Sequence, residues 1–185
     1  MATKTTLRAE VRSRRRARRA DSLATGQLFS PGTSHSPIPV RDRTEAEGLA
    51  HQIRSLTSSM DAVTLPALFV PTPLEPDMSL ALGLFERALL PVLLDEAGAP
   101  LGGSRWGLWE TGRALVTLGR PPAQPDGEAR GAESLKDADL IVIPALAASA
   151  DGTRLGQGGS WYDRALVRRR PGTPVVAAIF DDEVL

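Results

Sequence analysis

The chain lacks cysteine and has no long apolar run. Without thiols it forms neither disulfide bonds nor thiolate metal sites, which is typical of proteins from a reducing compartment. Its two histidines, His35 and His51, lack the spacing of metal ligands, so we expect both to be exposed. The longest apolar runs are about nine residues, whereas a helix needs roughly 20 to cross a bilayer, and no apolar signal segment follows the basic N-terminus. We therefore expect a cytoplasmic protein that is not embedded in a membrane.

Net charge is also absent, and aromatic residues make up only 4% of the chain. The balance of acidic and basic residues argues against wholesale binding of nucleic acid. Six arginines nevertheless lie close to the N-terminus, namely Arg12, Arg14, Arg15, Arg16, Arg18 and Arg19. Such a run is more often an exposed helix face than an RNA site, and few aromatic residues accompany it. Its role stays open from the sequence.

The length and composition of the chain predict one globular domain over residues 1–185, because 185 residues with 42% hydrophobic side chains can bury a sizeable core. Composition and periodicity predict helices at 4–20, 45–58, 78–90 and 161–169, and strands at 64–70, 92–94, 115–118, 140–146 and 175–180. Strands that alternate with helices predict an α/β protein, with three αβα layers around a mostly parallel sheet.

The most informative segment is residues 154–164, which read Arg-Leu-Gly-Gln-Gly-Gly-Ser-Trp-Tyr-Asp-Arg. Glycines let backbone N–H groups approach a phosphate, arginines neutralise its charge, and an aspartate can hold the Mg²⁺ that accompanies a nucleotide. The spacing is that of neither a G-x-G-x-x-G loop nor a Walker loop. An apolar run at 139–144 precedes the segment, and open α/β sheets place ligands beyond the carboxyl ends of such strands. The segment therefore predicts a polyphosphate site.

Three blocks of the sequence carry a family resemblance. Residues 138–166 combine the strand with Asp151-Gly152, Arg154-Leu155-Gly156 and Trp161-Tyr162-Asp163-Arg164. Residues 4–8 read Lys-Thr-Thr-Leu-Arg, and Leu-Phe-Val-Pro at 68–71 is followed by Glu75-Pro76-Asp77. In their order along the chain, the three blocks resemble the signature segments of the 5-formyltetrahydrofolate cyclo-ligases, also called methenyltetrahydrofolate synthetases. In that family the Glu-x-Asp element, which Glu75-Pro76-Asp77 resembles, contacts the substrate.

The resemblance implies an ATP- and Mg²⁺-dependent closure of a ring on a folate. The γ-phosphoryl group of ATP is transferred to the formyl oxygen of 5-formyltetrahydrofolate, nitrogen 10 attacks the activated carbon, and phosphate departs to leave 5,10-methenyltetrahydrofolate and ADP. Such a transfer depends on positioning and on neutralising negative charge, so we expect Lys, Arg, Mg²⁺ and backbone donors rather than a nucleophilic triad. We expect a monomer with a small-molecule substrate and with neither membrane nor nucleic acid as a partner.

The resemblance also implies individual roles. It makes Arg154 and Asp163 catalytic, with Asp163 as the Mg²⁺ ligand. It assigns ATP binding to Lys4, Thr5, Thr6, Leu7 and Arg8 and to Arg154, Leu155, Gly156, Gln157, Gly158, Gly159, Ser160, Trp161 and Tyr162. It assigns folate contacts to Val70, Glu75, Gln157, Gly158, Gly159, Ser160 and Trp161. The residues alone leave plainer alternatives open: a solvated helix face for Lys4 and Arg8, a turn for Glu75, and core positions for Trp161 and Tyr162.

The sequence departs from the family pattern in several places. Ser160 stands where the family usually has glycine, and Trp161 stands where it has tyrosine. Trp106, Trp109 and Glu110 match a further element only weakly. Family members also continue beyond the strand at 175–180 with a segment that supplies a second Mg²⁺ ligand and a last strand, and we expect the domain to lack both. Two alternatives therefore remain: a catalytically impaired homologue that binds folate or nucleotide, and an RNA-interacting protein.

Overall fold

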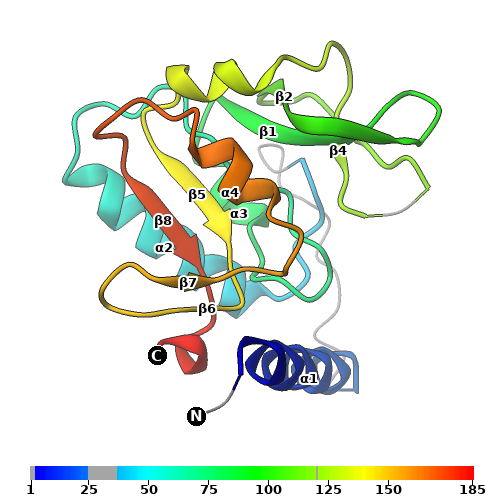
Figure 1. The fold of residues 1–185 in the computed structure, drawn as a ribbon, viewed down its shortest axis with the longest axis vertical. Coiled ribbons are helices and arrows are strands. Elements are labelled where there is room, and N and C mark those ends of the chain that lie inside the picture. Colours follow the sequence, from blue (N-terminus) through cyan, green and yellow to red (C-terminus); the bar gives the residue numbers. More distant parts are fainter. Residues whose placement is uncertain (1–2, 25–36, 120) are drawn as a thin grey trace.

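The chain contains both helices and strands and has the α/β fold expected from the sequence, although three helices precede the first strand and the two kinds of element do not alternate regularly (Figure 1). The structure is a computed structural model that describes residues 3–24, 37–119 and 121–185, so His35 lies outside it. The helices are α1 (Lys4–Ala24), α2 (Arg43–Ser58), α3 (Ser79–Leu82) and α4 (Trp161–Leu166), with 3-10 helices η1 (Ala132–Asp137) and η2 (Asp181–Glu183). The strands are β1 (Arg87–Leu94), β2 (Pro100–Glu110), β3 (Leu115–Val116), β4 (Gln124–Pro125), β5 (Ile141–Pro144), β6 (Ala147–Ala148), β7 (Arg154–Leu155) and β8 (Val175–Ala178).

The central strands pair in both directions. β5 and β8 are parallel, whereas β1 and β2 form an antiparallel pair with Arg87 opposite Glu110. Ala67 lies between the two pairs and makes parallel bridges to Leu89 and Ile141. The expected strand at 64–70 is therefore reduced to a bridge, although it occupies the middle of the assembly. The pairs β3–β4 and β6–β7 are antiparallel.

The expected helix at 78–90 is wrong. Only Ser79–Leu82 is helical, and the chain then extends into β1, whose residues 88–92 are all buried. A segment that is apolar on every side fits a strand covered on both faces as well as a buried helix, so its composition does not distinguish the two. The sequence predicts no strand at 100–110, where β2 lies, because Gly102 and Gly103 interrupt the residue pattern typical of a strand.

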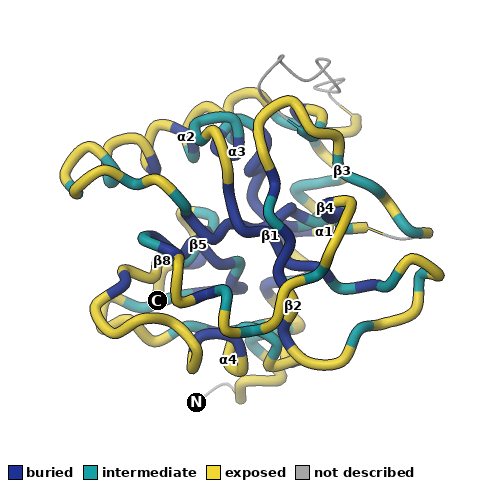
Figure 2. Tube along the Cα trace, turned by 90° about the horizontal axis from the view of Figure 1, so that it is seen from above, coloured by how far each residue is buried: buried dark blue, intermediate teal, exposed yellow. Residues whose placement is uncertain are grey.

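Burial is concentrated on the two faces of the central strands (Figure 2). Successive residues of a strand point to opposite faces, and accordingly Leu90 packs with α2 and α3 while Leu89 packs with η1 and α4. Trp109 belongs to the first cluster and Trp106 to the second, each with 1% of its surface exposed. Both tryptophans are thus core residues. Glu110 is exposed beside Arg113, with 3.7 Å between their charged atoms.

Most of the remaining elements agree with expectation. The helices at 4–20 and 45–58 are α1 and α2, and the helix expected at 161–169 is the shorter α4. His51 is exposed, as expected. In the part of the chain that the structure describes, no helix is both long and apolar enough to span a membrane.

Gly107 of β2 provides a test of the β1–β2–β4 packing. A Cβ at this position would lie 2.8 Å from Cβ of Pro125 and 3.0 Å from Cγ2 of Val92. We expect Gly107→Ala to lower the free energy of unfolding by about 1–3 kcal/mol in urea denaturation, because the added methyl overpacks the interface. Gly102→Ala on the same strand, where a Cβ would meet nothing within 4 Å, is the control and should change it by less than about 0.5 kcal/mol. Equal losses in both variants would contradict the packing.

Candidate functional site

The N-terminal helix and the glycine-rich loop lie against each other. Nε of Arg8 donates a hydrogen bond to the carbonyl oxygen of Gly156 at 3.0 Å, across 148 residues of sequence. One turn further along, Nη2 of Arg12 donates to the carbonyl oxygen of Gln157 at 2.6 Å. Figure 1 shows α1 running past the end of the molecule that carries β6 and β7. The structure thus brings the two most distant predicted segments together.

A short hairpin presents the loop. β6 and β7 are joined by a turn in which the Oδ1 atom of Asp151 accepts a hydrogen bond from the N–H of Thr153 at 2.8 Å, and Gly152 has a φ of +85°. The Ser149 hydroxyl, which also bonds Asp151, lowers the pKa of that carboxyl. The N–H of Leu146 donates to the carbonyl of Leu155 at 2.7 Å, so the chain returns to the end of β5 before the glycines begin.

A cavity of about 430 Å³ opens between α1, the loop and the end of β5. Three cationic side chains and two carboxylates line it: Lys4, Arg8, Arg154, Glu75 and Asp163. The remaining lining residues are Pro144, Leu155, Gly156, Gln157, Gly158, Gly159, Ser160, Trp161 and Tyr162. Every residue that the sequence assigns between 154 and 163 therefore lies around one space.

The loop backbone keeps this space open. A Cβ on Gly156 or Gly159 would meet no heavy atom within 4 Å, so a side chain there would project into free space. Gly158 has a φ of +104°, which L side chains rarely adopt. Ser160 has a left-handed φ of 51°, a conformation that favours glycine and explains why glycine is the usual residue of the family pattern there. The loop residues suit close approach of an anion to the backbone.

Three residues predicted to bind ATP do not line the cavity. Thr5 and Thr6 are exposed, and the N–H of Thr6 is capped by the Thr3 hydroxyl at 3.2 Å. Leu7 packs instead against the apolar cluster that contains Val11. The spacing of an α-helix explains the result, because Lys4 and Arg8 share a face from which the intervening side chains diverge.

An apolar cavity of about 300 Å³ adjoins the cationic one. Its walls include Phe69, Val70, Pro91, Leu93, Pro122 and Ala123. Glu75, Pro144, Trp161 and Tyr162 line both cavities, so an occupant of one lies next to an occupant of the other. Of the expected folate contacts, Val70, Glu75 and Trp161 line the apolar cavity. The others, Gln157, Gly158, Gly159 and Ser160, line only the cationic one.

Glu75 is held by its own turn. Its Oε2 atom accepts hydrogen bonds from the backbone N–H and the hydroxyl of Thr72, at 2.8 and 2.9 Å. Arg41 supports the turn by donating to the carbonyl oxygens of Thr72 and Glu75 at 3.1 and 2.9 Å. Within the described residues Oε1 of Glu75 has no hydrogen-bond partner, which leaves it available to a ligand. Nothing in the sequence around Arg41 indicates this role.

Asp77, the other acid of the Glu-x-Asp element, does not line either cavity. It is 1% exposed, and its carboxylate accepts hydrogen bonds from the backbone N–H groups of Arg41, Asp42 and Ser79 at 2.7, 3.1 and 3.0 Å. These bonds join the turn to the start of α2. Asp77 thus fixes the backbone in this structure, and its implied substrate contact stays a prediction.

Trp161 and Tyr162 belong to the core and to the site at once. The Trp161 ring packs edge-on against Trp106, with 5.2 Å between centroids, and against Tyr162 at 4.8 Å. Burial, and secondly the negative charge of Glu75, raise the pKa of Tyr162 well above its ordinary value of 10.0. The phenol therefore stays protonated at neutral pH and is available as a hydrogen-bond donor.

Arg154 and Asp163 form an ion pair at the rim of the cationic cavity. The Asp163 side chain is 65% exposed and the Arg154 side chain 24%, so the carboxylate is accessible from solvent. The described residues contain no group of three or more metal-ligating side chains. A Mg²⁺ ion that takes most of its oxygen ligands from phosphate and water needs only one or two carboxylates. Asp163 fits that more limited role.

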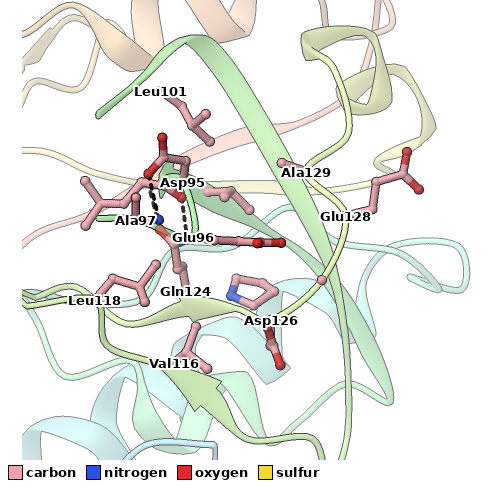
Figure 3. A pocket seen from close by; sticks show the side chains of 14 residues that line it. Asp95, Glu96, Ala97, Leu101, Val116, Leu118, Gln124, Asp126, Glu128 and Ala129 are labelled. Atoms are coloured by element: carbon pink, nitrogen blue, oxygen red, sulfur yellow. Dashed lines mark hydrogen bonds between the residues drawn. The ribbon is translucent and has the colours of Figure 1, made fainter. Parts of the chain in front are cut away.

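A larger cavity, of about 930 Å³, lies elsewhere, between β1, β2, β3 and β4. Figure 3 shows it with the acidic side chains Asp95, Glu96, Asp126 and Glu128 spread around its rim without converging on one point. Oδ1 of Asp95 is already bonded to the N–H groups of Ala97 and Ala99 in a turn. None of the site residues expected from the sequence lines this cavity.

Four of the six arginines in the run bind other parts of the same chain. Arg15 pairs with Glu183, and both Arg14 and Arg18 pair with Asp182, so three members of the run contact η2. Arg12 contacts the loop, as described above. Neither Glu183 nor Asp182 carries a local sequence signal of this pairing, since the partners lie 164 to 168 residues away.

A glycine-lined, cationic cavity beside an apolar one suits a phosphorylated ligand next to an organic molecule. The model of the 5-formyltetrahydrofolate cyclo-ligase family matches residues 1–185, and the chain belongs to this family. It is accordingly an enzyme of the ligase class.

Individual relatives agree with this assignment. A 5-formyltetrahydrofolate cyclo-ligase of Mycolicibacterium smegmatis is 36% identical over 154 residues, which cover 80% of this chain and 76% of that protein. The fold is similar to the 5,10-methenyltetrahydrofolate synthetase of Aquifex aeolicus, with a TM-score of 0.60 and 20% identity over 96% of this chain and 80% of that one. It is also similar to the synthetase of Mycoplasma pneumoniae, with a TM-score of 0.56 and 16% identity over 100% and 89% of the two chains.

Tyr162 is the only tyrosine, so its ionisation can be followed directly by ultraviolet absorbance. We expect the folded chain to show no tyrosinate at pH 10, whereas the chain unfolded in urea titrates near pH 10. Glu75→Gln should lower the folded pKa, because it removes the negative charge. Because the unfolded state releases the proton first, the free energy of unfolding should fall as pH rises above about 10, and Tyr162→Phe should abolish that part of the fall. A titration midpoint at 10 in the folded chain would contradict the burial of the phenol.

Proposed function

We propose that the chain closes the ring of 5-formyltetrahydrofolate to 5,10-methenyltetrahydrofolate with ATP and Mg²⁺, releasing ADP and phosphate. Family membership supports the reaction. The observation that carries it in this chain is that Lys4 and Arg8 line the same cavity as residues 154–163. A cluster of cations around bare backbone is what phosphoryl transfer requires, because catalysis there consists of positioning and charge neutralisation.

The cationic cavity is the proposed phosphate site. Lys4, Arg8 and Arg154 balance the negative charge of the phosphates, and Arg154 also stabilises the additional charge that develops during transfer. The N–H groups near Gly158 and Gly159 approach the phosphates because no side chain stands between them. In the proposed complex, a phosphate replaces Asp163 as the ion-pair partner of Arg154, which leaves the Asp163 carboxylate without that partner. Asp163 would then help to hold Mg²⁺, and that ion would supply positive charge to the phosphate oxygens.

The apolar cavity is the proposed folate site. Glu75 is fixed by Thr72 and faces both cavities, so its free oxygen can accept hydrogen bonds from the N–H donors of the pterin. Val70 supplies an apolar contact, and Trp161 and Tyr162 provide ring surfaces. The four shared wall residues support this arrangement, because ligands bound in the two cavities would be neighbours. Bringing the formyl oxygen next to the phosphates would lower the entropic part of the barrier.

The two alternatives from the sequence receive less support. An RNA-interacting helix requires free arginines, whereas Arg12, Arg14, Arg15 and Arg18 are bonded to other parts of the chain. A homologue without catalysis would still use the same cavities, so turnover decides that alternative. The proposal keeps the single domain, the monomeric state and the cytoplasmic location expected from the sequence. It also keeps three layers around a mostly parallel sheet, which the parallel β5–β8 pair and the bridges of Ala67 support.

The test of the proposed reaction is the rise in absorbance of 5,10-methenyltetrahydrofolate when the chain is mixed with 5-formyltetrahydrofolate, ATP and Mg²⁺. We expect Asp163→Asn to need a higher Mg²⁺ concentration for half-maximal rate and to lose on the order of 10-fold or more in rate at limiting Mg²⁺. Asp61→Asn changes an exposed carboxylate that follows α2 by three residues; it is the control and should behave like the unmodified chain. A flat trace from well-folded, unmodified protein would rule the reaction out.

Arg8 provides the test of the phosphate site. We expect Arg8→Ala to raise KM for ATP roughly 10- to 100-fold while KM for the folate changes little, because the lost interaction is a charge-assisted bond to phosphate. Arg16→Ala removes an equally charged, exposed residue from the same helix and should leave both constants unchanged. Steady-state kinetics with each substrate varied in turn measures both. A matching rise in KM for both substrates would argue against a separate phosphate site.

A further inference from the structure

α1 is held on the molecule by very few buried side chains. Of its 21 residues only Val11 and Arg15 are buried. Val11 packs against Leu146 and Leu155, an apolar contact that resists separation but permits small rotations and shifts. The helix nevertheless presents Lys4 and Arg8 to the cavity, and the 3.0 Å bond from Arg8 to Gly156 depends on where the helix lies. A directional contact is therefore needed to fix its register.

Arg15 makes that directional contact. Its Nε and Nη2 atoms donate to the two carboxylate oxygens of Glu183, each at 2.7 Å, and Nη2 also donates to the carbonyl oxygen of Ala145 at 2.6 Å. The side chains of Arg15 and Glu183 are 1% and 0% exposed. The second oxygen of Glu183 further accepts the N–H of Phe180 at 3.0 Å, so the carboxylate is itself fixed. A paired, planar arrangement of this kind defines both position and orientation.

The acceptors of Arg15 connect it to the phosphate site. Ala145 follows Pro144, which lines both cavities. Arg15 lies seven residues after Arg8, which is about two turns or 10.5 Å along the helix and nearly the same face. A slip of α1 by one turn would displace Arg8 by about 5.4 Å and break its bond to Gly156. Arg15 thus sets where Lys4 and Arg8 stand.

We propose that Arg15, with Glu183 as its acceptor, is a positioning residue for the phosphate site. It touches neither ligand and acts through α1, by fixing the helix so that Lys4 and Arg8 line the cavity. The inference rests on the proposed function of that cavity. It assigns to the buried pair at η2 a specific effect on nucleotide binding, beyond holding the chain together.

The main variant is Arg15→Met with Glu183→Gln. Removing both charges avoids leaving one of them buried without a partner, which would itself unfold the chain. We expect MgADP binding by calorimetry to weaken, and KM for ATP to rise, on the order of 10-fold, with KM for the folate changed less than about twofold. Arg15→Lys, which keeps the charge but loses the planar pair, gives the same split with a smaller loss of thermal stability. Asp182→Asn removes the exposed α1–η2 ion pairs and is the matched control, with MgADP affinity unchanged.

A second background separates positioning from general stability. In a chain that already carries Arg8→Ala and Lys4→Ala, the double change at Arg15 and Glu183 should weaken MgADP binding no further, because the groups it positions are gone. An equal further loss in that background overturns the proposal, and so does unchanged MgADP affinity in both folded Arg15 variants. Failure of the proposed function appears differently, as absence of turnover in the unmodified chain, whatever the Arg15 variants do to MgADP binding.

Discussion

The site depends on one constraint: a helix at the start of the chain has to meet a loop that follows it by about 150 residues. The contact between them is polar, and the bond from Arg8 to the Gly156 carbonyl is its centre. A helix so rich in arginine has little apolar surface with which to dock. The buried part of its attachment is therefore divided between one small apolar cluster around Val11 and an ion pair at Arg15, while other arginines make more exposed bonds. Such an attachment is weak in area but specific in direction, which suits a helix that delivers charge to a ligand.

The sequence predicted the parts of the site that carry a local signal. The string at 154–163 is unusual enough in composition that its role follows from glycine and arginine chemistry, and the structure places all of it around one cavity. Helical spacing likewise predicted that Lys4 and Arg8 share a face. The same spacing explains why Thr5, Thr6 and Leu7 do not line the cavity. A motif consists of consecutive residues, whereas a helix presents only some of them on one face.

The remainder could not be read from the sequence because it depends on partners that are remote. The segment at 78–90 is apolar on every side, and its end forms a strand because it pairs with β2. Arg41, Asp77 and Glu183 are ordinary charged residues in their local context. Their roles arise when folding brings a carbonyl or a carboxylate to them, as with Arg15 and Glu183. Polar supports of this kind are the least visible part of a site, although they set its geometry.

The wall between the two cavities has a thermodynamic consequence. Glu75, Pro144, Trp161 and Tyr162 are touched from both sides, so the free energy of filling one space contains contributions from atoms that also border the other. In the proposed arrangement the two ligands would border the same four side chains, and any effect of one ligand on these side chains would alter the affinity of the other by an equal factor in both directions. Such coupling would need no movement of distant parts.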